Sequence, residues 1–135
     1  MKIKVSEAAP RQLDHMVHVA IGLTIREDFK YGRMYYRPQT KPGEVAWDNT
    51  SLPYSTNWSQ GGPIIERGKI AILPNDGHRF SQWHAFCWAP SQHDLTFEDG
   101  QSHNQRGPTP LIAAMRCLVA SKLGDEAEVP DALTS

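Results

Sequence analysis

Cysteine is scarce in this 135-residue chain, which contains only Cys87 and Cys117. Two thiols are too few for a disulfide scaffold, and they do not form the C-x-x-C pair of a zinc or redox motif. A reducing compartment is therefore the default expectation. Because Cys87 lies between two aromatic residues, we predict a packed thiol rather than a nucleophile at this position.

Neither sign of charge is in excess. The chain has 14 lysines and arginines against 15 aspartates and glutamates, which gives a formal net charge of −1. This balance disfavours a protein that holds duplex DNA mainly through phosphate contacts. No apolar stretch approaches the length of a membrane span, and Met1 to Val5 does not have the features of a signal sequence. We therefore expect no membrane partner, no duplex DNA partner and a cytoplasmic location.

The common sequence signatures of catalysis are also missing. The chain has no G-x-S-x-G elbow, no Walker loop, no H-E-x-x-H and no dinucleotide fingerprint. The segment Gly61-Gly62-Pro63 is not followed by the lysine of a phosphate-binding loop. We therefore predict binding rather than catalysis, with no catalytic residue and no cofactor.

Two histidines are spaced so that both could reach one metal ion, because His15 and His18 are three residues apart in a predicted helix. No third ligand follows at a characteristic spacing, so no metal site is predicted. The preferred interpretation places Asp14, His15 and His18 on the outer face of the helix, with Asp14 paired to His18.

The sharpest local signals mark a helix over residues 110–123. Thr109 suits the N-cap, and Gly124 suits the left-handed position just past the end. One stripe of the helix is apolar, and the opposite side carries small residues where a solvated face would be charged. These residues are Leu111, Ile112, Met115, Leu118, Val119 and Leu123 in the stripe, and Ala113, Cys117, Ala120 and Ser121 opposite. The helix is therefore expected to be covered on both sides and central to the fold.

One charge interrupts this helix, and a guanidinium near a core needs a partner. The partner of Arg116 is either a carboxylate elsewhere in the chain or an anionic group of a ligand, which a guanidinium can hold in a bidentate fashion. The free amides at the helix start, next to Thr109, would also favour a phosphate or carboxylate.

The remaining elements predict an α+β fold. A second helix is expected over about residues 10–21 and ends at Gly22. Strands are expected at 1–5, near residue 25, and at 69–73 and 83–88, the last two forming an antiparallel hairpin or part of a meander. The sequence thus predicts a small antiparallel sheet packed with two main helices, at about 10–21 and 110–123. One domain is expected over residues 1–135, with a polar loop at 91–105 and a tail at 125–135.

The segment Tyr54–Arg67 begins with many neutral hydrogen-bonding groups around one indole ring. Its candidate ligand-binding residues are Tyr54, Ser55, Thr56, Asn57, Trp58, Gly61 and Gly62. The two glycines permit unusual backbone geometry and the close approach of a partner, which suits a recognition loop. The alternative is a wide turn whose polar side chains satisfy their own backbone. Ile64 and Ile65 are expected to begin a strand.

The segment Phe29–Lys41 alternates basic and aromatic residues and contains no acid. Four basic groups among four rings are what a single-stranded nucleic acid or a nucleotide would contact. The alternative is a strand or hairpin with one solvated basic face.

Three pieces of the chain together resemble the NinX family of lambda-like bacteriophages and prophages, described as accessory proteins of unknown function. They are MKIKVSE followed by Leu13-Asp14, YSTNWSQGGPIIER, and GPTPLIAAMRCLVASKLGDEAEVP. The chain departs from the family pattern at His15, where the family has Trp, and at Asn57, where it has Asp. The resemblance implies a phage gene product acting in the bacterial cytoplasm, and it supplies no reaction.

We weigh three functions. The first is non-enzymatic binding of a small, anionic, ring-containing ligand, such as a nucleotide signal of host defence that a phage protein would sequester. Trp58 and Trp83 would stack on its ring, while Arg116 and the amides at Thr109 would hold its phosphate. Such a protein is expected to be a homo-oligomer, because small domains often build pockets between chains.

The alternatives involve larger partners. One is a protein-interaction module that engages a host or phage replication or defence protein through exposed aromatic residues. The other, weaker alternative is single-stranded nucleic-acid binding through Phe29–Lys41.

Overall fold

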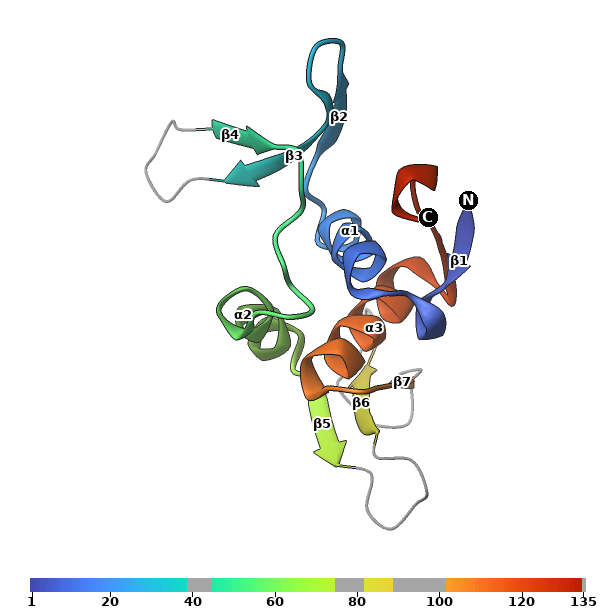
Figure 1. Ribbon diagram of the computed structural model, residues 1–135. Coiled ribbons are helices and arrows are strands. Elements are labelled where there is room, and N and C mark those ends of the chain that lie inside the picture. Colours follow the sequence, from blue (N-terminus) through green and yellow to red (C-terminus); the bar gives the residue numbers. More distant parts are fainter. Residues whose placement is uncertain (39–44, 75–81, 89–101, 135) are drawn as a thin grey trace, which may run out of the picture.

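A computed structural model describes residues 1–38, 45–74, 82–88 and 102–134 (Figure 1). The elements in chain order are β1 (Lys2–Lys4), η1 (Val5–Glu7), α1 (Pro10–Ala20), β2 (Ile25–Asp28), β3 (Gly32–Pro38), β4 (Val45–Asp48), α2 (Trp58–Gly68), β5 (Ala71–Pro74), β6 (Trp83–Trp88), β7 (Ser102–Gly107), α3 (Pro110–Leu123), β8 (Glu126–Glu128) and η2 (Asp131–Leu133). The α+β class is confirmed. The described strands form three small antiparallel sheets, ordered β1-β8, β2-β3-β4 and β5-β6-β7, where one sheet was predicted.

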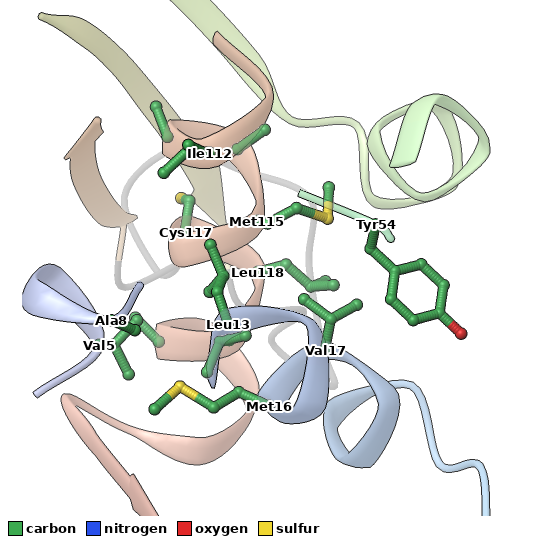
Figure 2. Close-up of a cluster of buried hydrophobic side chains, with 14 of the residues drawn as sticks. Val5, Ala8, Leu13, Met16, Val17, Tyr54, Ile112, Met115, Cys117 and Leu118 are labelled. Atoms are coloured by element: carbon green, nitrogen blue, oxygen red, sulfur yellow. The ribbon is translucent and has the colours of Figure 1, made fainter. Parts of the chain in front are cut away.

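Helix α3 is the centre of the fold, as predicted. The hydroxyl of Thr109 accepts a hydrogen bond from the Ile112 amide at 3.1 Å, and Gly124 ends the helix with a φ of +91°. The helix packs against β6 and β7 and also against α1 and α2. Figure 2 shows side chains of α1 and α3 meeting in the core, where Leu13, Met16 and Met115 are fully buried. Both the apolar stripe and the side of small residues are therefore covered.

The predicted hairpin is formed by β5 and β6, and β7 adds a third strand to it. Residues 102–105 were expected in a polar loop, and this prediction is wrong, because they belong to β7. Main-chain hydrogen bonds to β6 order this strand, and its polar composition does not reveal them. Residues 91–101 of the expected loop lie outside the described residues.

The C-terminal segment, expected as a tail, instead contains β8. Lys2 lies opposite Glu128 and Lys4 lies opposite Glu126. Opposite charges on facing strands stabilise such a pair modestly. Ala127 between them is buried, so the end of the chain packs onto its beginning.

The prediction of a strand at Ile64 and Ile65 is wrong, because these residues lie in helix α2. Asn57 caps the helix, with its side-chain oxygen accepting from the Ser59 amide at 2.8 Å. A short apolar run fits a strand and a helix equally well, which explains the error. The helix also accommodates Pro63, because the preceding Gly62 lacks the Cβ that would clash with the proline ring.

The polar face of α1 is buried, contrary to the prediction. Asp14, His15 and His18 are only 8%, 7% and 1% exposed, because Tyr35 of β3 and the loop at Ser55 pack over them. Asp14 accepts a hydrogen bond from the Ser55 amide at 2.8 Å and is not paired with His18. His15 Nδ1 lies 2.7 Å from the Tyr35 hydroxyl, and His18 Nε2 lies 3.2 Å from a main-chain oxygen.

The sheet of β2, β3 and β4 projects from the body beyond α1, and we call it the arm (Figure 1). The described part of the basic and aromatic segment, residues 29–38, forms the tip of its first hairpin and strand β3. Residues 39–41 lie outside the described residues. Within the described ranges, no helix is long and apolar enough to cross a membrane.

Candidate ligand-binding site

The first two predicted ligand-binding residues lie inside the protein. Tyr54 is 3% exposed, and Figure 2 shows its ring at the edge of the core with the hydroxyl pointing away from it. That hydroxyl is buried, and within the described ranges it has no hydrogen-bond partner. Ser55 is 1% exposed and connects the chain to α1, because its amide donates to Asp14 and its hydroxyl donates to the Pro10 carbonyl at 3.4 Å. The structure gives both residues a packing role.

The next three predicted residues lie at the surface, where α2 begins. Thr56 and Asn57 are exposed, and the Asn57 side chain is occupied by capping. Trp58 is the first residue of the helix, and it is 55% exposed. This indole is free to contact a partner.

Gly61 and Gly62 lie within α2 and have ordinary negative φ angles, so neither supplies unusual backbone geometry. A Cβ built on Gly61 would collide with the Tyr54 carbonyl oxygen and would lie 2.6 Å from a methyl group of Leu111. The close contact that Gly61 permits is therefore with Tyr54 and Leu111 of the same chain.

The last three predicted residues lie on other elements. Trp83 of β6 is partly buried against the core, and the Thr109 hydroxyl is engaged in capping α3. Arg116 lies in the middle of α3 and borders a hollow of about 330 Å³. The other nine predicted residues are absent from the described lining of this hollow. The ten predicted residues thus do not form one site. Arg116 is the one among them that belongs to the described lining of this hollow.

Arg116 is held by main-chain carbonyls. Its Nη1 donates to the Arg106 carbonyl at 2.9 Å, and its Nη2 donates to the Ala8 carbonyl at 3.1 Å. Its Nε is buried and has no hydrogen-bond partner among the residues that the structure describes. Among the described residues no carboxylate forms an ion pair with Arg116. The first of its two predicted partners, a carboxylate elsewhere in the chain, is therefore not found among them. Burial lowers the pKa of this guanidinium, although an arginine stays protonated at neutral pH.

The hollow is lined by cationic and neutral polar side chains. Its described lining residues are Ser6, Gln82, Asn104, Gln105, Arg106 and Arg116. Two of the six carry positive charge, and none of the six is acidic. Guanidinium groups, amides and a hydroxyl can all donate hydrogen bonds, so this surface is suited to an anion.

A second hollow, of about 370 Å³, is lined by Met1, His15, Glu128, Val129, Pro130 and Asp131. Glu128 and Asp131 already neutralise the terminal ammonium of Met1, at 2.9 and 3.6 Å. Its two carboxylates would repel an anion, so it is a poorer candidate.

Two aromatic rings that were not predicted, those of His84 and Phe86, share a sheet face with two lining residues of the first hollow, although neither ring is in its described lining. The register of β6 and β7 places His84 opposite Arg106 and Phe86 opposite Asn104. Facing residues of an antiparallel pair share one face of the sheet. The His84 and Phe86 rings lie 4.2 Å apart, and His84 Nε2 lies 3.4 Å from Asn104 Oδ1. Along β6, the buried Ala85 and Cys87 alternate with His84 and Phe86. This period of two is present in the sequence and could have placed the two rings on the other face of the strand.

No curated protein matches this chain. One family model matches residues 4–122, which include all ten predicted ligand-binding residues and both arginines of the hollow. This range covers most of the 135 residues, so the chain belongs to the family described as Bacteriophage P22, NinX.

Proposed function

We propose that this phage-family protein is a non-enzymatic binding protein for a small, anionic, ring-containing ligand, with nucleotides as the leading class. The anion would lie in the hollow beside Arg116 and Arg106. The observation that carries the proposal is the half-buried guanidinium of Arg116, which has only neutral acceptors among the described residues. A buried charge without a counterion is costly, and an anionic ligand would compensate it.

The arrangement of Arg116 favours binding without rearrangement. A guanidinium has five N–H donors. Among the described residues, two of them donate to the carbonyls of Arg106 and Ala8, and the Nε–H is buried, so two Nη N–H groups remain. The two carbonyls hold the plane of the group, so little side-chain freedom is lost when a ligand arrives. Arg106 supplies a second cation at the same hollow. Two guanidinium groups at one hollow suit the several oxygens of a phosphate.

The ring of the ligand would lie against His84 and Phe86. These rings share a face with Asn104 and Arg106, which line the hollow, so a ring and an anion can be held next to each other. Stacking on an aromatic ring contributes about 1–3 kcal/mol per base in nucleic-acid complexes. The hollow of about 330 Å³ is at the lower end of the sizes usual for small-ligand pockets.

In a phage-family protein, the use we propose for this site is the sequestration of a nucleotide signal of host defence in the bacterial cytoplasm. Binding without turnover is sufficient for this purpose. No catalytic residue is needed, and the lining residues include no group arranged as a nucleophile and base.

The test is calorimetric titration with a panel of nucleoside mono-, di- and triphosphates and cyclic nucleotides. Replacing Arg106 by glutamine is expected to weaken binding of the best ligand about tenfold or more, because charged hydrogen bonds contribute roughly 1.5–3 kcal/mol. Arg116→Lys retains the charge but not the planar donor set, and we expect a similar loss.

The matched control is Arg67→Gln, at an exposed arginine of α2. It removes the same charge from the protein and is expected to leave the affinity unchanged. Equal affinity of the wild type, Arg106→Gln and Arg116→Lys would refute the proposed site.

A further inference from the structure

We infer that the outward face of the arm pairs with the same face of a second copy of this chain. This outer arm face consists of Arg26, Asp28, Met34, Tyr36 and Trp47. Register assigns these residues to one side of the sheet, because Arg26 faces Met34 and Tyr36 faces Trp47 on neighbouring strands. The inference concerns a surface separate from the hollow at Arg116.

The two faces of the arm differ in what covers them. The inner face carries Tyr35, which packs on α1, and two ion pairs, Arg33 with Glu27 at 3.6 Å and Arg37 with Asp48 at 3.2 Å. On the outer face, Trp47 contacts Tyr36 at 5.3 Å between ring centroids, and the Arg26 guanidinium lies 4.4 Å from the Trp47 ring. These ring, cation and ion-pair contacts of the outer face lie within the arm itself, and Met34, Tyr36 and Trp47 are partly exposed.

The arm projects from the body (Figure 1), and its inner face contacts α1 through Tyr35. Trp47, Tyr36 and Met34 of the outer face would be buried if they met an equivalent surface. Aromatic residues with an adjacent arginine are the composition expected at the centre of a protein interface.

Charge favours a second copy over a nucleic acid. The outer arm face carries one cation and one anion, Arg26 and Asp28, whose side chains lie 3.9 Å apart. In a two-fold pair, the same patch meets itself, so Arg26 of one copy can face Asp28 of the other. The arginines of the inner face are neutralised by their own carboxylates, and a chain with net charge −1 offers little repulsion between copies.

The tip of the arm is fixed and apolar. Phe29 is fully exposed and Tyr31 is 59% exposed. The Asp28 carboxylate accepts hydrogen bonds from the amides of Lys30 and Tyr31, at 2.8 and 2.9 Å, which hold the turn. If two arms pair antiparallel, the tip of one reaches the base of the other, where Val19 in the last turn of α1 is 41% exposed.

Cysteine cross-linking tests the proposed face. Met34→Cys places a thiol on the outer arm face, and diamide should convert a large fraction of this variant to a disulfide-linked dimer of twice 15.2 kDa. The matched control is Glu27→Cys, which is on the inner face of the same strand pair with an exposed side chain and should remain monomeric. The native cysteines are both buried.

Light scattering of the wild-type chain over a concentration series gives the second readout. We expect a dimer, and Arg26→Glu should raise its dissociation constant at least tenfold while leaving the circular dichroism spectrum unchanged. The inference is overturned if the wild type stays monomeric at all concentrations. It is equally overturned if the dimer is insensitive to Arg26→Glu, or if inner-face and outer-face cysteines cross-link alike.

Discussion

Replacing Gly61 by alanine is expected to lower the free energy of unfolding by about 3 kcal/mol, at the upper end of the usual cost of overpacking. The new methyl group would collide with the Tyr54 carbonyl oxygen and lie 2.6 Å from Leu111 Cδ1. The carbonyl belongs to a backbone that cannot yield easily, because the adjoining Ser55 amide is bonded to Asp14. Urea unfolding followed by circular dichroism measures the effect.

The neighbouring glycine supplies the control. A Cβ on Gly62 would meet only an edge atom of Trp58, at an ordinary 3.9 Å. Alanine is preferred over glycine in a helix by up to about 1 kcal/mol, but the residue before a proline is restricted, and these effects oppose each other. Gly62→Ala should therefore change the stability by less than about 1 kcal/mol. Equal effects at the two positions would contradict the packing of α2 on α3 described above.

Acidification from pH 6.5 to pH 4 is expected to destabilise the protein by about 3 kcal/mol through His15. Burial, with smaller contributions from Arg33 and His18, lowers the pKa of His15 from 6.5 to about 4. A group whose pKa is lower in the folded state stabilises the fold above its unfolded pKa. That contribution is lost as the pH falls through the folded pKa. The difference of 2.5 pKa units corresponds to about 3 kcal/mol at 1.36 kcal/mol per unit.

Two neighbours modify this pH dependence. Burial also lowers the pKa of His18, so His18 adds to the loss in acid. Burial raises the pKa of Asp14, so protonation of Asp14 in acid favours the folded state and offsets part of it. Urea unfolding at several pH values should show a much flatter profile for His15→Gln, which keeps a hydrogen-bonding group near Tyr35 and does not titrate. An unchanged profile would show that His15 is not the group responsible.

The parts of the fold that the sequence predicted are those with complete local signals. Thr109, Pro110 and Gly124 mark both ends of α3, and its two non-polar sides required burial. Helix α2 was missed because Asn57 suits a turn as well as an N-cap, and because two adjacent isoleucines fit either period.

The burial of His15 and His18 depends on a contact with Tyr35, which lies at least 17 residues further along the chain. No local pattern around these histidines indicates such a partner. Polar residues on one side of a predicted helix usually face water. Here Tyr35 of the arm packs over His15 and His18 and buries them.

The candidate site was predicted only in part, for a related reason. Hydroxyl, amide and glycine residues occur in ligand loops and also in helix caps and close packing, and Ser55, Asn57 and Gly61 are of the second kind. Arg116 was identified because an isolated charge in an apolar helix has few explanations. Asn104 was missed because residues 102–105 of β7 were taken for part of a loop, and Arg106, which follows them, was not singled out in the sequence.

The most direct measurement of the central claim is the Nε–H resonance of Arg116 in arginine-labelled protein, titrated with the best-binding nucleotide of the panel. Among the described residues this buried Nε has no hydrogen-bond partner, and a negative charge bound in the hollow beside the guanidinium should shift its signal. We predict a saturable shift of the Arg116 and Arg106 Nε–H signals, with that of Arg67 unchanged. Binding that leaves both hollow arginines unperturbed, or a panel in which no nucleotide binds, would contradict the account.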